Sequence, residues 1–410
     1  MKATFPPLSL LQVAALTPPD VEVAVQDEAV ENLDLDADCD LVGITAFTSS
    51  APRAYEVASA FRERGVPVVI GGMHASARPD EALQYCDSVV IGEAEGVWPR
   101  LLGDAREGRL ARVYQSAGYP DLTENPAPRR DLLRRDDYLA PDTVQATRGC
   151  AHGCSFCSVS SFFGRRIRTR SVDRVIEEVA ALPGRLVIFV DDNIMALPSY
   201  ASQLFERLRG LGKSWMGQAS TAVLGNTELV RLGARSGCRA LFVGLETLSD
   251  KALRQVNKGF NVAGRFTDLV SRLHDAGIGV IGAFMFGFDE DDASVFERTA
   301  EFADRARIDV PQYSILTPLP GTPLHAQMEA EGRITDRDWS HYDGSHVVFS
   351  PRNSTPETLV DGLKTALKHS YSRLGILRRL CGLSARLPTM VALNLAFRRR
   401  AISWATRPTT

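Results

Sequence analysis

The feature that most constrains this chain is an alternation of short apolar runs with amphipathic segments between residues 143 and 330. Runs rich in Val, Ile and Phe are typical of buried parallel strands, and the segments between them have the periodicity of covering helices. Six such units in succession predict a partial (β/α)6 barrel of the TIM type. The predicted strands are VQATRG, RLVIFVDDN, WMGQAS, ALFVGLE, GVIGAFMFGFD and VPQYSIL.

A second, shorter alternation lies near the N-terminus. The apolar runs LVGITAF, PVVIGG and SVVIGE are separated by helical segments such as RAYEVASAFRERG, a pattern that predicts another parallel sheet. The segment AGYPDLTENPAPRRDLL is Pro-rich and aperiodic, as linkers are. We therefore expect an α/β protein with a Rossmann-like domain at 1–115, a linker at 116–140, a barrel at 141–330 and a C-terminal capping region at 331–410.

Charge and hydropathy exclude several classes of function. The net charge of −3 over 410 residues argues against a general nucleic-acid binder, which usually carries a basic excess. No stretch of about 20 apolar residues suggests a membrane span, and the first residues lack the apolar core of a secretory signal. We expect a cytoplasmic protein.

Three of the seven cysteines lie within eight residues, in RGCAHGCSFCSV. Cys150, Cys154 and Cys157 have a spacing suited to a metal centre, because thiolates are soft ligands for iron–sulfur clusters or zinc. Three ligands are one short of a closed zinc site, although zinc stays open as an alternative. Around a cubane they leave one iron free, and Phe156 would shield it from water. We interpret the scattered cysteines, Cys39, Cys86, Cys238 and Cys381, as small buried residues.

The CxxxCxxC segment after a first barrel strand resembles the signature of the radical S-adenosylmethionine (SAM) superfamily. This resemblance implies a [4Fe–4S] cluster on the three cysteines and SAM bound to the free iron. Reduction by one electron then cleaves SAM to methionine and a 5′-deoxyadenosyl radical. Further segments resemble the family at the ends of later strands, where barrel enzymes build their sites. They supply Asp191, Asp192 and Asn193 for the SAM ammonium, Gln218 as a further cofactor contact, Glu246 for the ribose, and Gly282 and Phe286 for the adenine.

The N-terminal segments PPLSLLQVAALTPP, DLVGITAFTSS, RGVPVVIGGMHA and VVIGEAE resemble the cobalamin-binding subgroup of this superfamily. The resemblance implies a cobalamin held against the cluster-facing mouth of the barrel. Candidate contacts, mostly small residues at strand ends, are Thr45, Thr48, Ser49, Gly71, Gly72, Gly92 and Glu93.

Two features depart from that pattern. No DxHxxG motif supplies an axial histidine, and we expect His74 to serve packing rather than to bind cobalt. Only MKATF precedes Pro6, which is short for the strand and corrin-facing loop that usually come first in the subgroup. A degenerate domain without cobalamin therefore stays open as an alternative.

The leading hypothesis is a cobalamin-dependent methyltransferase that acts on an unactivated carbon, with a flavodoxin or ferredoxin as reductant. A second hypothesis is radical cyclisation, oxidation or rearrangement, as in the anaerobic cyclase of bacteriochlorophyll synthesis, which the sequence also resembles. A third, from another class, is a non-catalytic regulatory protein that binds a cluster or a corrinoid. The retained SAM segments argue against it.

Candidates for contact with the substrate or partners lie in three places. A capping segment, DWSHYD, could close the barrel mouth with Trp339, His341, Tyr342 and Asp343, or could be an ordered loop. Residues 373–410 contain eight arginines and no acidic residue, so this tail is either a helical cap or a peripheral contact with anionic lipid. A contact with lipid would suggest a lipid-like substrate, whereas a helical cap leaves any small-molecule substrate open. The arginines after the cysteines could bind an anionic substrate or an acidic reductant; they are Arg165, Arg166, Arg168 and Arg170.

Overall fold

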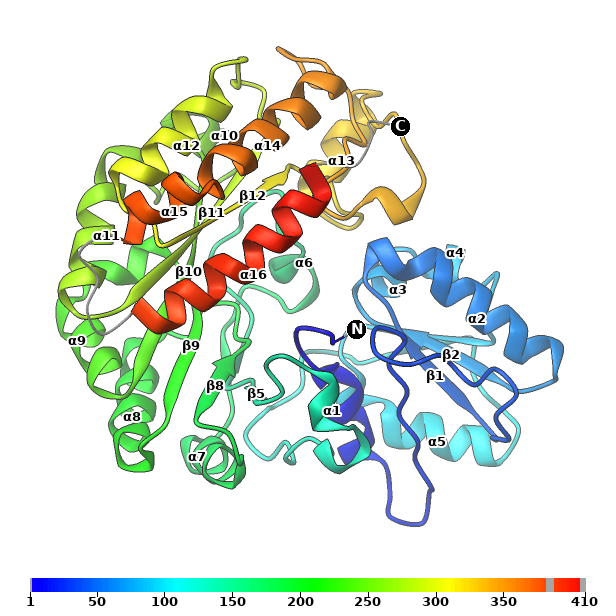
Figure 1. Ribbon diagram of the computed structural model, residues 1–410. Helices are drawn as coiled ribbons and strands as arrows, with labels where there is room; N and C mark the ends of the chain where they lie inside the picture. The colour runs from blue at the N-terminus through cyan, green and yellow to red at the C-terminus, as the bar shows by residue number, and fades with distance from the viewer. Residues whose placement is uncertain (1, 381–386, 406–410) are drawn as a thin grey trace.

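A computed structural model describes residues 2–380 and 387–405, which form two α/β units lying side by side (Figure 1). The first unit is a four-stranded parallel sheet in the order β1-β2-β3-β4. Three strands are those predicted, and β4 is a short edge strand that the sequence did not indicate. The elements of this unit are α1 (Leu8–Leu16), β1 (Val42–Thr45), α2 (Ala51–Glu63), β2 (Val68–Gly71), α3 (Met73–Ala77), α4 (Pro79–Ala82), β3 (Ser88–Ile91), α5 (Trp98–Arg106) and β4 (Val113–Gln115).

The second unit confirms the predicted (β/α)6 partial barrel. Six parallel strands follow one another in the order β12-β11-β10-β9-β8-β5. They are β5 (Thr143–Val144), β8 (Leu186–Phe189), β9 (Ser214–Ala219), β10 (Cys238–Glu246), β11 (Gly279–Phe286) and β12 (Val310–Ile315). The helices beside them are α7 (Val172–Ala181), α8 (Pro198–Leu208), α9 (Thr227–Arg235), α10 (Asp250–Gln255), α11 (Phe266–Asp275), α12 (Val295–Arg305) and α13 (Pro323–Ala330).

The first predicted barrel strand is interrupted after two residues. Its second half forms β6 (Thr147–Arg148), which pairs antiparallel with β7 (Arg168–Thr169). This β6–β7 ribbon carries the cysteine segment, residues 149–167, as a long loop that contains the short helix α6 (Ser158–Phe162). The predicted metal-binding segment is therefore held at both ends by one small sheet.

The barrel sheet has two differently packed faces, because successive side chains of a strand alternate. Trp215, Leu241 and Phe284 point outward into the main core with the surrounding helices. Ile281 and Val310 point inward, into a smaller apolar cluster that also contains Met216, Ala240, Leu380 and Met390. This assignment of faces decides which predicted residues can reach a ligand in the lumen.

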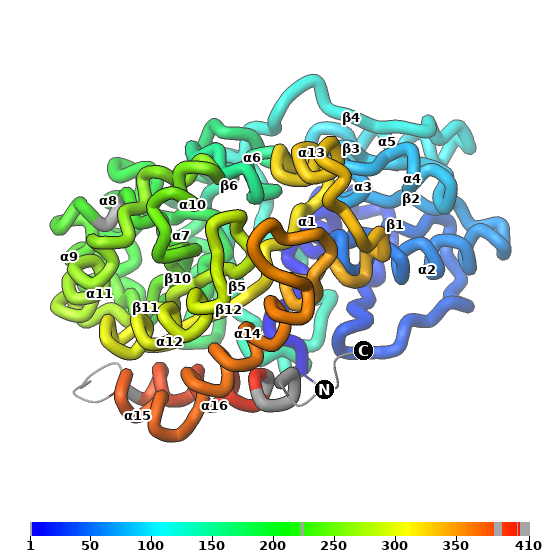
Figure 2. Tube along the Cα trace, turned by 90° about the horizontal axis from the view of Figure 1, so that it is seen from above, coloured from blue at the N-terminus to red at the C-terminus, as the bar shows by residue number. Residues whose placement is uncertain are grey.

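Two C-terminal helices, α15 (Arg373–Leu380) and α16 (Leu387–Ala405), close the lower half of the lumen at the amino ends of the strands, and α16 crosses the inner face of the sheet (Figures 1 and 2). The helix before them, α14 (Pro356–Ser370), packs outside the barrel on α12. Met390 is fully buried, and a Cβ added to Gly279 would lie 2.8 Å from its sulfur. A strand glycine therefore gives α16 room to approach the sheet closely.

A buried polar cluster fastens these helices to the barrel. Arg379 is 0% exposed; it donates to Asp304 Oδ1 at 2.9 Å and to Asn394 Oδ1 at 3.3 Å. Asn394 in turn donates to the Asp309 carbonyl at 2.9 Å. Arg379 is thus part of a structural ion pair and not of a surface contact. The tail residues Arg386 and Arg407, and Cys381, lie outside the described residues.

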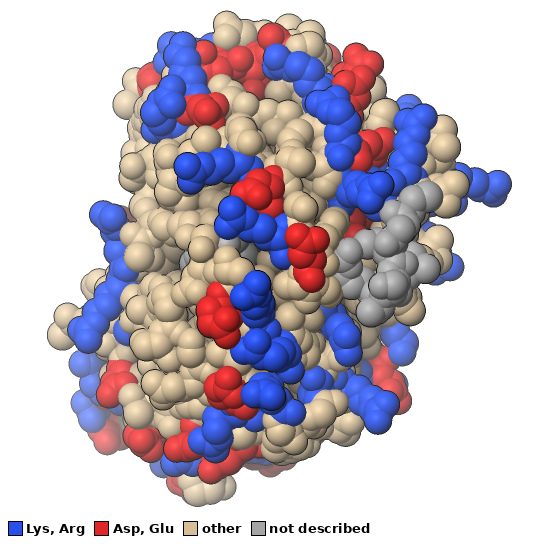
Figure 3. All heavy atoms as spheres, turned by 90° about the vertical axis from the view of Figure 1, so that its left-hand side faces the viewer, with Lys and Arg blue, Asp and Glu red and all other residues tan. Residues whose placement is uncertain are grey.

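Within the described ranges no helix is long and apolar enough to cross a membrane. The face made by the outer barrel helices carries Lys and Arg interspersed with Asp and Glu, so no single sign of charge dominates it (Figure 3).

Candidate functional site

The cysteine loop lies at the carboxyl ends of the barrel strands and is fixed by several backbone contacts. The Asn257 amide donates to the Gly153 carbonyl at 2.8 Å, and the Ser155 amide donates to the Val256 carbonyl at 3.0 Å. Gly149 has φ +91°, and a Cβ there would lie 2.7 Å from the Arg166 carbonyl oxygen, so only glycine fits. The loop is held in place before any metal binds.

The three thiols lie close to one cation. Burial raises the pKa of Cys150, Cys154 and Cys157, to about 11 for Cys154, while the Lys258 ammonium lowers each of them. Among the described residues no three His, Cys, Asp or Glu side chains lie close enough together to hold a single metal ion. Three thiols around a partly buried loop fit a cluster, whose irons are bound by separate thiolates.

Lys258 is a site residue that the sequence analysis missed. It forms a buried ion pair with Glu246, the side chains being 12% and 9% exposed, and its Nζ lies 5.7 Å from the centre of the Phe156 ring. Burial lowers its pKa, but Glu246 and the thiols reverse this and hold the pKa above its ordinary value. Glu246 has φ +70°, an unusual conformation for a residue with a side chain. The carboxylate predicted to meet ribose is thus already paired.

The three residues after β8 have different roles. Asp191 is 0% exposed, and its carboxylate accepts from the Ala146 amide at 3.1 Å and the Thr147 hydroxyl at 2.7 Å. The Asp191 carboxylate therefore holds β6, and its predicted contact with the SAM ammonium stays a prediction. Asp192 is less buried and accepts from the Gly149 amide at 3.2 Å; burial raises its pKa to about 6, opposed by that amide. Asp192 remains a candidate for the SAM ammonium.

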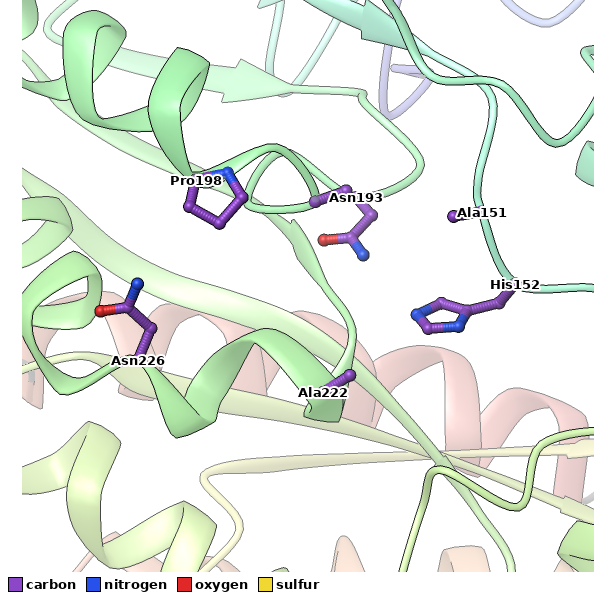
Figure 4. Close-up of a pocket in the computed structure, with 7 residues that line it drawn as sticks. Ala151, His152, Asn193, Pro198, Ala222 and Asn226 are labelled. Carbon is purple, nitrogen blue, oxygen red and sulfur yellow. The ribbon is translucent and has the colours of Figure 1, made fainter.

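Asn193 faces a cavity of about 300 Å³ beside the cysteine loop (Figure 4). Its amide nitrogen donates to Ser220 Oγ at 3.0 Å, while its Oδ1 is buried without a partner among the described residues. His152 lines the same cavity, stacked on Phe260 at 3.8 Å, and burial together with the Lys258 cation lowers its pKa. Asn193 thus keeps the acceptor that its predicted role requires.

The alternation of β11 decides which way the predicted adenine residues face, and their contact with adenine stays a prediction. A Cβ on Gly282 would contact Ile308 at 2.9 Å, and Phe286 packs on Phe296 at 4.7 Å, so both face the covering helices. Their neighbours Ala283 and Met285 occupy the lumen face instead. Gln218, on the inner face of β9, is exposed there as its predicted role requires.

The carboxyl edge of the first sheet presents small residues toward the barrel. Gly72 has φ +96°, and a Cβ there would lie 2.7 Å from Thr45 Oγ1, while a Cβ on Gly92, at φ +81°, would meet nothing within 4 Å. Gly71 lies beside Gly72 at the end of β2, and Phe47 is 71% exposed next to Thr45. Open backbone beside an exposed aromatic ring fits a flat macrocycle such as cobalamin.

Segment 338–343 packs between the barrel and helices of the first unit. The Trp339 indole donates to Glu81 Oε1 at 2.7 Å and lies 5.2 Å from His74, whose Nε2 pairs with the Tyr55 hydroxyl at 3.0 Å. The short helix Trp339–His341 also contacts Thr48–Ser50, which buries Thr48 and leaves Ser49 half-buried. His74 thus serves packing. Tyr342 is 3% exposed and Asp343 binds Ser345, as in an ordered loop.

Glu93, predicted to contact the corrin, is paired with two arginines, and its contact with the corrin stays a prediction. Both of its carboxylate oxygens are occupied by Arg148 and Arg168 of the ribbon. Arg170 pairs in the same way with Glu178. Of the four arginines after the cysteines, Arg165 and Arg166 stay exposed.

Comparisons with known proteins agree with both units. A family model described as the radical SAM superfamily matches residues 144–303, and one described as a B12 binding domain matches residues 2–102. Over 390 residues the chain is 34% identical to bacteriochlorophyllide d C-12(1)-methyltransferase of Chlorobaculum tepidum, covering 92% of this chain and 85% of the relative. This chain belongs to the cobalamin-binding radical SAM methyltransferases.

Two further matches agree with this. Bacteriochlorophyllide d C-8(2)-methyltransferase of the same organism is 28% identical over 85% of this chain and 82% of its own length. The structure of TsrM from Kitasatospora setae with cobalamin and a [4Fe–4S] cluster superposes with a TM-score of 0.64 at 16% identity, covering 90% of this chain and 89% of TsrM. The cofactors of this radical SAM methyltransferase are therefore the cluster, SAM and cobalamin, and its thiols and glycine edge fit them.

Proposed function

We propose that this enzyme methylates an unactivated carbon of a large, mostly apolar small molecule held in the upper half of the barrel lumen. The observation that carries this is the inner face above α16, where Gln218 is exposed and Phe242, Met285 and Gln312 are partly exposed. Such a wall suits a polycyclic body with a few polar substituents. Two relatives are named as methyltransferases of bacteriochlorophyllide d, which supports a substrate of this class.

The chain contributes binding and orientation. When bound, the cluster, SAM and cobalamin supply the radical and methyl-transfer chemistry. Asp192 and the free Oδ1 of Asn193 would accept from the SAM ammonium, and Lys258 would face its carboxylate. Phe156 excludes water beside the thiols, and α16 seals the lumen from below, so that reactive species meet the substrate and not solvent.

The test is an anaerobic incubation of reconstituted holoenzyme with trideuteromethyl-SAM, a reductant, and either a bacteriochlorophyllide or a hopanoid. We expect one acceptor to gain a trideuteromethyl group, with 5′-deoxyadenosine and S-adenosylhomocysteine released in equal amounts. SAM cleavage that yields an oxidised or cyclised product without a new methyl group contradicts the proposal and favours the second hypothesis.

The exposed arginines suggest where the electron donor docks. Arg165 and Arg166 lie on the solvent side of the cysteine loop, and Arg165 contacts the Ala151 carbonyl at 3.4 Å. We propose that they receive the acidic surface of a flavodoxin or ferredoxin, since they lie on the loop whose cysteines would hold the cluster. Donors of this kind are cytoplasmic proteins, which supports our proposal of a cytoplasmic location.

Helices α15 and α16 leave apolar side chains in solvent. Leu374, Leu377 and Leu395 are 55%, 61% and 52% exposed, and Arg378 of the same face is 58% exposed. Leucines flanked by arginines, with no acidic residue after 373, suit peripheral contact with an anionic membrane.

We expect the double variant Leu374→Asp, Leu377→Asp to bind vesicles of phosphatidylcholine and phosphatidylglycerol about tenfold more weakly than the parent protein, because each leucine loses its apolar contact. Co-sedimentation measures this. Leu139→Asp is the matched control, since Leu139 is 66% exposed but lies elsewhere. Equal binding of the double variant and the control contradicts a lipid-facing role.

A further inference from the structure

Glu93 connects the cobalamin-type unit to the ribbon that carries the cysteines. It follows β3 at the carboxyl edge of the first sheet, and its side chain is 2% exposed. Oε1 accepts from Arg168 Nη2 at 2.6 Å, and Oε2 accepts from Arg148 Nη1 at 2.6 Å and from Arg168 Nη1 at 3.1 Å. One carboxylate of the first unit therefore holds two arginines of the second.

The two arginines occupy the ends of the cysteine loop. Arg148 and Arg168 lie directly opposite each other in the antiparallel β6–β7 pair, and Arg148 precedes Cys150 by two residues. The intervening Gly149 is fixed further by its hydrogen bond to Asp192 at 3.2 Å. A group that fixes Arg148 and Arg168 therefore fixes both ends of the cysteine loop.

Arg168 joins additional segments. Besides Glu93, its guanidinium donates to the Pro120 carbonyl at 3.1 Å and to the Phe163 carbonyl at 3.2 Å, and it lies 4.9 Å from the centre of the Tyr119 ring. Pro120 and Tyr119 belong to the connection between the two units, and Phe163 ends the helix after Cys157. The first unit, the connection and the cysteine loop thus converge on one planar group.

These four buried charged side chains are better suited to orienting the two units than to merely holding them together. Glu95 also pairs with Arg148, so two carboxylates balance two guanidinium groups whose side chains are only 12% and 10% exposed. Burying charges costs free energy, and apolar residues of similar volume would hold two surfaces together as well. A forked guanidinium on a carboxylate, by contrast, sets both distance and angle.

We propose that Glu93, Arg148 and Arg168 are positioning residues that set the distance and orientation between the cobalamin unit and the cluster loop. The proposal rests on the methyl-transfer function. In that reaction a hydrogen is removed from the substrate carbon near the cluster, and the same carbon then takes the methyl group from the cobalamin side. Both groups must therefore face one carbon within a fraction of an ångström.

If the proposal holds, a Glu93 variant should cleave SAM without methylating the substrate as often. In Glu93→Gln one carboxylate oxygen becomes an amide donor that faces two arginines. The β6–β7 ribbon then loses the ion pairs that hold it to the first unit. The cysteines are unchanged, and SAM cleavage should persist. We expect the amount of 5′-deoxyadenosine released per methylated product to rise about tenfold or more.

The control variant is Glu178→Gln. Glu178 is equally buried and accepts from Arg130 and Arg170 at 2.6 Å each, but neither arginine belongs to the first sheet. Glu178→Gln should lose as much stability as Glu93→Gln, but it should release the same amount of 5′-deoxyadenosine per methylated product as the parent enzyme. Glu93→Asp and Arg168→Lys keep the charges but alter the geometry; they should be intermediate and serve if Glu93→Gln does not fold.

A second measurement does not depend on turnover. Pulsed dipolar electron paramagnetic resonance between cob(II)alamin and the reduced cluster should show a broader distance distribution in the Glu93 variants than in Glu178→Gln. Loss of stability with an unchanged distance distribution overturns the positioning role. If the parent enzyme makes no methylated product, the methyl-transfer proposal fails, yet this measurement still decides whether Glu93 sets the spacing.

Discussion

Replacing Cys150, Cys154 or Cys157 with alanine is expected to abolish the [4Fe–4S] cluster and, with it, all reductive cleavage of SAM. The three thiols lie on one rigid loop, so no fourth cysteine among the described residues can move in as a substitute; Cys86 and Cys238 are buried in distant cores. Losing one of three protein ligands leaves two irons without a protein ligand, and such clusters fall apart.

Iron and sulfide analysis, the visible spectrum and the amount of 5′-deoxyadenosine measure this effect. Cys39→Ala is the matched control, because Cys39 is half-buried in the first unit, where its thiol donates to the Ala37 carbonyl at 3.7 Å, far along the chain from the cysteine loop. It should keep full iron content and activity. A variant at position 150, 154 or 157 that retains both shows that the ligands are assigned wrongly.

Replacing Lys258 with alanine is expected to lower the affinity for SAM by about a hundredfold while the cysteines still assemble a cluster. The ammonium is the cation nearest the thiols, and its loss leaves the Glu246 carboxylate buried and unpaired. Breaking a buried ion pair in this way costs about 3–5 kcal/mol, shared here between ligand binding and stability.

Anaerobic equilibrium binding of SAM to reconstituted protein tests this, with iron content measured in parallel. Lys251→Ala is the matched control, because this lysine of α10 is 66% exposed and pairs with Glu290 at the surface, where ion pairs contribute little. Lys258→Arg should restore part of the affinity. Unchanged SAM binding in Lys258→Ala contradicts a role in cofactor binding.

The architecture explains how two cofactor sites can serve one substrate. The glycine edge of the first sheet and the carboxyl ends of the barrel strands face each other, and polar contacts fix the two units at two places. One is Glu93 with the ribbon arginines, and the other is Glu81 with Trp339. Below the site α16 packs against the inner face of the barrel sheet and closes that end of the lumen.

The sequence by itself determined what local chemistry decides. Uninterrupted Val and Ile runs indicated the parallel strands, and the CxxxCxxC spacing identified the cluster ligands, because both patterns depend on neighbours in the chain. Small residues at strand ends likewise pointed to a cofactor edge at Gly72 and Gly92.

Only the tertiary structure decided which partner each side chain has. The phase of β11 turned Gly282 and Phe286 away from the lumen, since one residue of register reverses every side chain. Asp191 and Glu93 have the right residue type for ligand contacts, yet amides and arginines 44 to 75 residues away in the chain occupy their carboxylates. Lys258 carries no recognisable motif. Packing alone brings it to the thiols, because long-range pairing of buried charges leaves no local pattern in a sequence.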